Sequence, residues 1–132
     1  MTIVVAYVPR PEGQAALDKG IEIAKRRKEH LLVVNASPGG GKEDPSVLDG
    51  QDYERVKRLL DDAGIDAELK QFVRGKSAVE EIENLVASSN ASLLIIGLRK
   101  RSAVGKLILG SVAQDLLLSV SCPVLTVKAN RS

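Results

Sequence analysis

Short apolar runs alternate with amphipathic stretches along the whole chain, and this order constrains the fold more than any other feature. The runs are rich in β-branched and aliphatic residues, as buried strands are, and cover residues 2–8, 31–36, 65–73, 92–96 and 123–127. Between them, apolar residues recur at helical spacing in stretches at 12–28, 47–63, from Ser77 onward and at 109–120. Strands that alternate with helices predict right-handed parallel crossovers, and hence an open α/β sheet with helices on both faces.

Composition limits the classes of partner. A chain of 132 residues with 44% hydrophobic residues predicts one domain over residues 1–132. The formal charge of +2 is too small for a general polyanion binder, and 2% aromatic residues provide no stacking platform, so we expect no nucleic-acid partner. We expect a cytoplasmic protein with no membrane partner. The chain has a single cysteine and no leader-like start, and no apolar run approaches the roughly 20 residues needed to cross a bilayer.

The most informative stretch is GLRKRSAVGKLILGS, residues 97–111. Gly97 closes the fourth strand, and Gly110 and Ser111 open the following helix, where α/β sheets bind ligands beyond the carboxyl ends of their strands. Bare glycine backbone, a helix start and the Ser111 hydroxyl are groups that bind phosphate. An equally good interpretation makes Gly97 a turn residue and Ser111 a helix cap. The cations of the stretch either neutralise a phosphate or form a solvated basic loop: Arg99, Lys100, Arg101 and Lys106.

Other motifs point to no chemistry. Gly75-Lys76-Ser77 lacks the first glycine of a P-loop, because position 70 is lysine, and is interpreted as a turn and a cap. His30, the sole histidine, is expected on the surface, and Cys122 as a small buried residue. No cluster of metal ligands and no general base at the crevice is evident, so we do not expect an enzyme.

The element order and its ending, GLRKRSAVGKLILGSVAQDLLLSVSCPVLTVK, resemble the universal stress protein family over nearly the whole chain. The resemblance implies an adenine nucleotide alpha hydrolase-like fold, with a five-stranded parallel sheet of order 3-2-1-4-5. In nucleotide-binding members, it implies, ATP lies over strands one and four and a G-x2-G-x9-G-[S/T] loop holds its phosphates. Gly97 matches the first glycine, and Gly110 and Ser111 match the last pair. Mg²⁺ is expected only if ATP is bound.

Two positions depart from the family pattern. Lys100 replaces the second glycine, where its side chain either obstructs the phosphates or pairs with them. Val8-Pro9-Arg10 stands where the family carries an aspartate near adenine. Asn35-Ala36, at the end of strand two, takes the place of the purine contacts; Asn35 either bonds a base or satisfies strand-end backbone. The candidate ligand-binding residues are Val8, Pro9, Asn35, Ala36, Ile96, Gly97, Lys100, Gly110, Ser111 and Val112.

Two functions follow. The first is a regulatory module of the stress response that binds an adenine nucleotide, or another phosphate-bearing ligand, at residues 97–112. The alternative is a homodimeric protein-interaction module that has lost ATP binding and acts through protein partners. Weak ATPase activity ranks last. The strand Pro123–Val127 is apolar and expected at the sheet edge, and the resemblance implies a homodimer through it.

Overall fold

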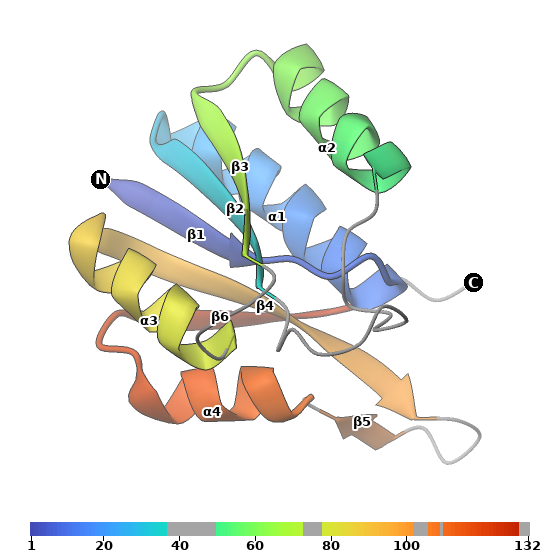
Figure 1. Ribbon diagram of the computed structural model, residues 1–132, viewed down its shortest axis with the longest axis vertical. Helices are drawn as coiled ribbons and strands as arrows, with labels where there is room; N and C mark the ends of the chain where they lie inside the picture. Colours follow the sequence, from blue (N-terminus) through green and yellow to red (C-terminus); the bar gives the residue numbers. More distant parts are fainter. Residues whose placement is uncertain (37–49, 73–77, 102–105, 109, 130–132) are drawn as a thin grey trace.

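The computed structural model describes residues 1–36, 50–72, 78–101, 106–108 and 110–129. Its centre is a parallel sheet in the order β3-β2-β1-β4-β6 (Figure 1). The strands are β1 (Thr2–Ala6), β2 (His30–Ala36), β3 (Ala67–Phe72), β4 (Ala91–Arg101) and β6 (Val124–Lys128). Numbered among the parallel strands alone, this order is 3-2-1-4-5, so the predicted topology is confirmed.

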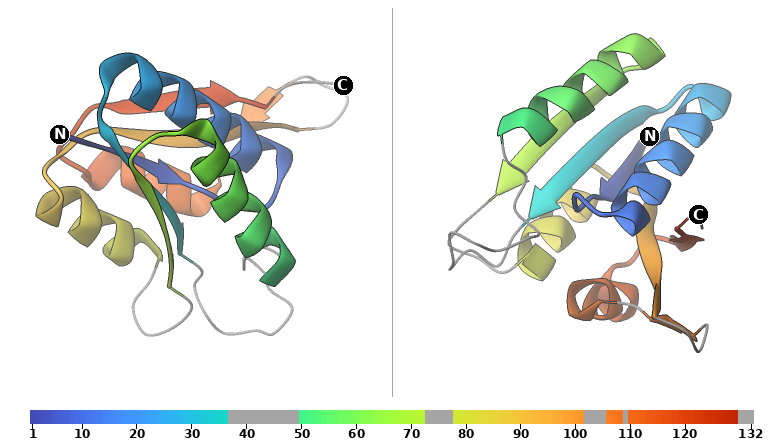
Figure 2. Two further views of the ribbon diagram at one scale, coloured as in Figure 1. Left: turned by 90° about the horizontal axis from the view of Figure 1, so that it is seen from above. Right: turned by 90° about the vertical axis from the view of Figure 1, so that its right-hand side faces the viewer.

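Helices cover both faces of the sheet. α1 (Pro11–Arg27) and α2 (Gly50–Ala63) lie on one face, and α3 (Ala78–Ser88) and α4 (Ser111–Ser119) lie on the other (Figures 1 and 2). The core is divided accordingly: Ile3 and Val5 of β1 belong to the α1 side, and Val4 between them belongs to the α3 side. Because both faces of β1 are buried, the strand is apolar without alternation. No helix within the described ranges is long and apolar enough to cross a membrane.

α1 packs very closely on the sheet. A Cβ on Gly20 would stand 2.5 Å from the Val5 side chain, and a Cβ on Gly13 would overlap the Val8 main chain. Pro11 occupies the first turn of α1, where its missing N–H costs no hydrogen bond. Gly13 therefore lets the first turn of α1 sit directly against the chain as it leaves β1, and Gly20 lets the middle of the helix approach Val5.

The largest departure from the predicted elements is at β4. The sequence predicts a strand that ends near residue 96, whereas β4 continues to Arg101 and pairs antiparallel with an additional short strand, β5 (Lys106–Ile108). We call residues 99–101 and 106–108 the β4–β5 ribbon. The expected open loop is wrong for these positions, because they form a pair of strands. The charged residues of the ribbon carry no apolar pattern that would predict a strand. The predicted cap at Ser77 and the start of the second helix at 47–49 lie outside the described residues.

Candidate functional site

The candidate site lies at the carboxyl ends of β1 and β4, two adjacent parallel strands. The chain turns from β1 toward β2 and β3 on one side, and β4 and β6 lie on the other, so strand order reverses between β1 and β4. Ligands of open α/β sheets bind at such a reversal. Val8 and Pro9 leave β1 here, half-buried, and Gly97 follows Ile96 in β4.

Gly97 is a glycine because α1 is packed against it. A Cβ at Gly97 would overlap the carbonyl oxygen of Glu12 and stand 2.6 Å from its carbonyl carbon. Gly97 is not one of the described glycines with positive φ, so no unusual turn requires it. On the α1 side, the space next to Gly97 therefore belongs to the first turn of α1 rather than to a ligand.

Asn35 fastens the end of β2 to the end of β1. Its side chain is fully buried, and its Nδ2 donates a hydrogen bond to the main-chain oxygen of Tyr7 at 3.0 Å. The Tyr7 amide in turn donates to the Val34 oxygen at 2.9 Å. This geometry matches the structural interpretation of Asn35, since its amide donor is used on the protein's own backbone. Ala36 ends β2 in register with Phe72 of β3.

Tyr7 joins three elements at this edge. Its side chain is only 2% exposed, and its hydroxyl accepts a hydrogen bond from Arg55 Nη2 of α2 at 2.8 Å. Arg55 Nη1 also donates to Gln14 Oε1 of α1 at 3.2 Å. Burial raises the pKa of the Tyr7 phenol, and the Arg55 charge opposes this in part. Arg55 thus couples α2 to the end of β1.

Gly110 and Ser111 begin α4 without an internal cap. Gly110 is the N-cap, with φ −65° and ψ 165°, and no side chain caps it. A Cβ on Gly110 would meet nothing within 4 Å. The described pairs of the ribbon end where Arg99 lies opposite Ile108, and Gly97 and Gly110 are each two residues farther along the chain.

The remaining predicted residues divide between the core and the ribbon. Ile96 is 1% exposed and belongs to the core under α3 and α4, and the partly buried Val112 packs against the same core, so both support the site from within. Lys100 pairs with Leu107 in the ribbon. Its main chain is three residues beyond Gly97, about 10 Å at the rise of a strand. The structure thus brings Val8, Pro9, Gly97 and Gly110 to one edge and carries the Lys100 backbone away from it.

Sequence reasoning missed three residues of this edge: Tyr7, Glu12 and Arg55. Gly13 is a signal in the sequence that points to the neighbouring Glu12, because a glycine in the first turn of a helix indicates close approach of another backbone. Arg55 gives no signal, since an exposed arginine on a helix is ordinary.

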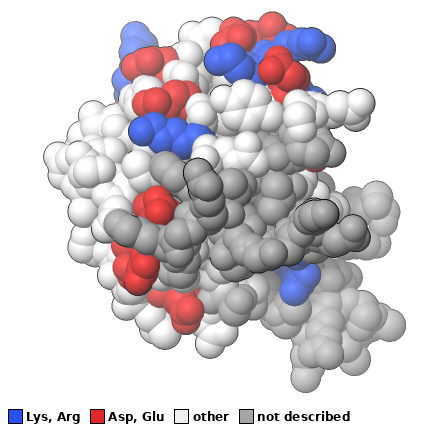
Figure 3. All heavy atoms as spheres, in the orientation of Figure 1, with Lys and Arg blue, Asp and Glu red and all other residues white. Residues whose placement is uncertain are grey.

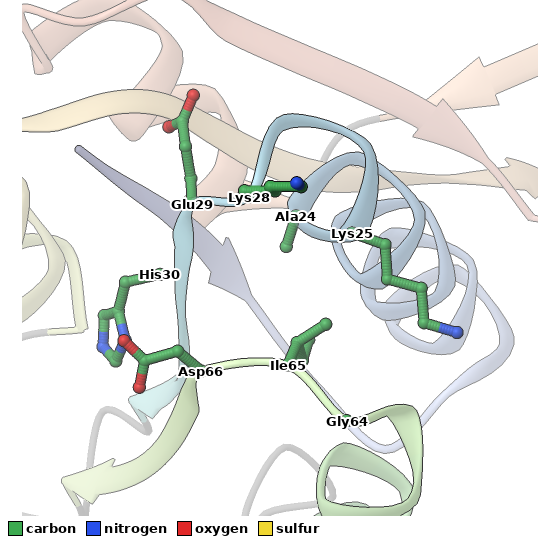
Figure 4. Close-up of a pocket in the computed structure, with 8 residues that line it drawn as sticks. All are labelled: Ala24, Lys25, Lys28, Glu29, His30, Gly64, Ile65 and Asp66. Atoms are coloured by element: carbon green, nitrogen blue, oxygen red, sulfur yellow. The ribbon is translucent and has the colours of Figure 1, made fainter.

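A hollow of about 320 Å³ lies at the opposite edge of the sheet, between the end of α1 and the starts of β2 and β3 (Figure 4). His30 faces Asp66 there, with Nδ1 3.1 Å from Oδ2, and its Nε2 lies 3.3 Å from Glu68 Oε1. His30, predicted on the surface, has 28% of its side chain exposed. Among the described residues, no group of three or more histidine, cysteine, aspartate or glutamate side chains is arranged to hold a metal ion.

The comparisons with known proteins agree with this architecture. The model of the universal stress protein family matches residues 1–128. The chain belongs to the universal stress protein family. A universal stress protein of Mycolicibacterium smegmatis is 47% identical over 126 residues, which cover 96% of each chain.

Solved structures of the family share the fold. A universal stress protein from Archaeoglobus fulgidus is 29% identical and has a TM-score of 0.74, over 96% of this chain and 97% of that one. A structure of the Archaeoglobus fulgidus universal stress protein in complex with dAMP is 23% identical, with a TM-score of 0.68 and 96% coverage of both chains. A universal stress protein in complex with cAMP is 21% identical, with a TM-score of 0.70 and 98% coverage of both chains.

Proposed function

We propose that this universal stress protein is a non-enzymatic regulatory module of the cytoplasm that binds an adenine nucleotide at the carboxyl edge of β1 and β4. The phosphate lies at the start of α4. The observation that carries the proposal is the contrast between two glycines. Gly97 is required by the packing of α1, whereas neither the backbone angles nor the surroundings of Gly110 require a glycine within the described protein.

A glycine that the fold does not require leaves the main chain open to a ligand. The first amides of a helix have no partner inside the helix, and the positive end of the helix dipole favours an anion. α4 has nine residues, and its N-cap makes no side-chain hydrogen bond. A phosphate at Gly110 would satisfy these amides, and Ser111 matches the hydroxyl residue of the family motif.

The adenosine part is assigned to the neighbouring strand ends. Relatives of the same fold bind dAMP and cAMP, which supports an adenine nucleotide as the ligand class. We place the base beside Val8, Pro9 and Ala36. Because the Asn35 side chain is fully buried and donates to the Tyr7 main chain, we assign base recognition to main-chain groups.

The test replaces Gly110 by aspartate. Aspartate is a good N-cap, so Gly110→Asp should leave the melting temperature unchanged or raise it. Its carboxylate should occupy the phosphate position and repel the phosphate. Calorimetric titration with AMP, cAMP and ATP should show binding to the parent protein and at least a tenfold loss in the variant. Leu118→Gln is the matched control, on the same helix and 81% exposed. If Gly110→Asp binds nucleotide as the parent does, or the parent binds none, the proposal is wrong.

A nucleotide-independent module is the second candidate, favoured by the missing carboxylate at Val8 and by the occupied Asn35 amide. It acts as a homodimer that binds protein partners. Recovery of an adenine nucleotide from freshly purified, denatured protein by mass spectrometry would exclude it.

For either function we propose a homodimer through β6. β6 pairs with β4 along one edge, and no described strand pairs with its other edge. The Pro123 oxygen and the Ala129 amide form hydrogen bonds with β4. Since alternate residues of a strand direct their backbone groups to opposite edges, the backbone groups of Thr126 point away from β4. Thr126→Pro would block pairing with a second copy without removing a bond to β4, whereas Thr126→Val keeps the N–H. Sedimentation at micromolar concentration should give a dimer for the parent and Thr126→Val, and a monomer for Thr126→Pro. A monomeric parent would contradict the proposal.

A further inference from the structure

We infer that the outer edge of β3 pairs with the same edge of a second copy of this chain, in an antiparallel register centred on Leu69. The inference does not depend on the proposed nucleotide site, and it concerns the edge of the sheet opposite to β6. β3 is the last strand on its side of the sheet: it pairs with β2, and no strand among the described residues pairs with its other edge (Figure 1).

The backbone groups of Leu69 point to this outer edge. The Leu31 amide donates a hydrogen bond of 2.9 Å to the Asp66 oxygen, so Asp66 directs its oxygen to β2. Since backbone groups alternate between the two edges of a strand, Glu68 and Lys70 also direct theirs to β2, and Leu69 directs its N–H and C=O outward. Two copies of Leu69 placed opposite each other therefore exchange two hydrogen bonds around a twofold axis.

Glu68 and Lys70 place opposite charges on one face of β3. Leu69, between them, packs against the core on the α1 side, so these two side chains lie on the other face of the strand. Glu68 is 52% exposed, and its Oε1 lies 3.3 Å from His30 Nε2, a contact that holds the carboxylate on this face. Acidic and basic side chains lie next to one another over β3, at the upper left of Figure 3.

These charges select the register. With Leu69 opposite Leu69, each Glu68 faces Lys70 of the second copy in the closely spaced pairs of an antiparallel ladder, where opposite charges are favourable. Pairing centred one residue earlier places Glu68 against Glu68, and pairing centred one residue later places Lys70 against Lys70. Charged residues usually protect an open edge from pairing. Here their placement on either side of Leu69 makes the edge complementary to itself.

Pairing through β3 is expected to be weaker than pairing through β6. Exposed ion pairs contribute little to association, whereas β6 presents apolar residues: Val124, Leu125 and Val127. The β3 contact should therefore form at millimolar rather than micromolar concentration. Because it uses the opposite edge of the sheet, it joins β6 dimers to one another instead of competing with them.

The test is sedimentation of the full chain carrying Thr126→Pro, which is designed to block pairing through β6. This protein should be a monomer at micromolar concentration and a dimer at millimolar concentration. Adding Glu68→Lys or Lys70→Glu creates like-charge pairs and should weaken self-association at least tenfold. An equal mixture of these two variants restores both attractive pairs and should dimerise. Asp115→Lys, an exposed change of the same sign on α4, is the control and should dimerise unchanged.

The mixture identifies the contact, because variants that do not self-associate bind each other only if residues 68 and 70 meet across the interface. Its dimerisation also shows that both variants are folded. Absence of association at millimolar concentration, unchanged self-association of either charge variant, or a monomeric mixture overturns the inference. If the parent is already monomeric at micromolar concentration, the same charge variants are tested in the parent chain. Nucleotide binding enters none of these measurements, so the proposed function stands or fails separately.

Discussion

The main chain of Glu12 occupies the space that a side chain at Gly97 would need. The carboxyl end of β4 and the first turn of α1 therefore form one packed unit, in which the backbone of one element substitutes for the side chain of the other. A second contact of the same kind joins Gly13 to the Val8 main chain. At the edge that carries the candidate site, Gly13 and Gly97 therefore allow the first turn of α1 to pack closely against β4 and the end of β1.

Gly97→Ala should lower the free energy of unfolding by about 1–3 kcal/mol, because the added methyl group must displace the backbone of α1. Gly110→Ala should cost less than about 1 kcal/mol, the range for a change of cap, since its Cβ enters open space. Urea denaturation of the two variants against the parent measures both values. Equal losses for the two would contradict the different origins assigned to these glycines.

The hydrogen bond from Arg55 to Tyr7 should couple α2 to β1. Arg55→Met and Tyr7→Phe each remove the bond of 2.8 Å, so the double variant should lose less than the sum of the single changes. We expect a coupling free energy of about 0.5–1.5 kcal/mol from a double-mutant cycle in urea. Arg58→Met, on the exposed side of the same helix, serves as the control and should show no coupling to Tyr7→Phe.

Stability should decrease at alkaline pH because of Tyr7. Burial raises the pKa of its phenol above the usual value of about 10, so the neutral form is favoured in the folded state. Its contribution is fully present below pH 10 and is lost as the pH rises through the higher folded value. Thermal melting between pH 8 and pH 11 should show a smaller alkaline loss for Tyr7→Phe than for the parent. Parallel curves for the two proteins would show that Tyr7 is not responsible.

Cys122 should react slowly with thiol reagents at neutral pH. Burial raises the pKa of its thiol, and a backbone hydrogen bond opposes this only in part. Since the thiolate is the reactive form, labelling by Ellman's reagent at pH 7.5 should be slower than that of free cysteine and should accelerate when urea unfolds the chain. A folded protein that reacts as fast as free cysteine would contradict the assigned direction.

The parallel fold could be predicted from the sequence because hydrophobic pattern and element order determine it together. Residues 2–8 and 31–36 are apolar on both faces, which only a sheet covered by helices on both sides accommodates. The ribbon could not be predicted in the same way. Arg99, Lys100 and Arg101 are poor strand residues, and their strand depends on pairing with residues 106–108 rather than on burial.

The sequence predicts which strand and which helix carry the candidate residues, but not what packs against each of them. The sequence locates Gly97 and Gly110 at the carboxyl edge, as the structure does. It does not distinguish a glycine required by packing from a glycine that leaves space for a ligand, because that difference depends on what lies next to each Cα in three dimensions. The partner of the Tyr7 hydroxyl, Arg55, is likewise 48 residues away in sequence, and the same arginine bonds Gln14 of α1.

The register of the β4–β5 ribbon has a consequence for how such chains vary. Because the two strands run antiparallel, adding one residue to each lengthens the ribbon and returns the chain to the same point. Homologous chains can therefore differ in the length of this segment by pairs of residues while the sheet edge stays constant. The same property makes the ribbon a suitable place to insert a reporter peptide.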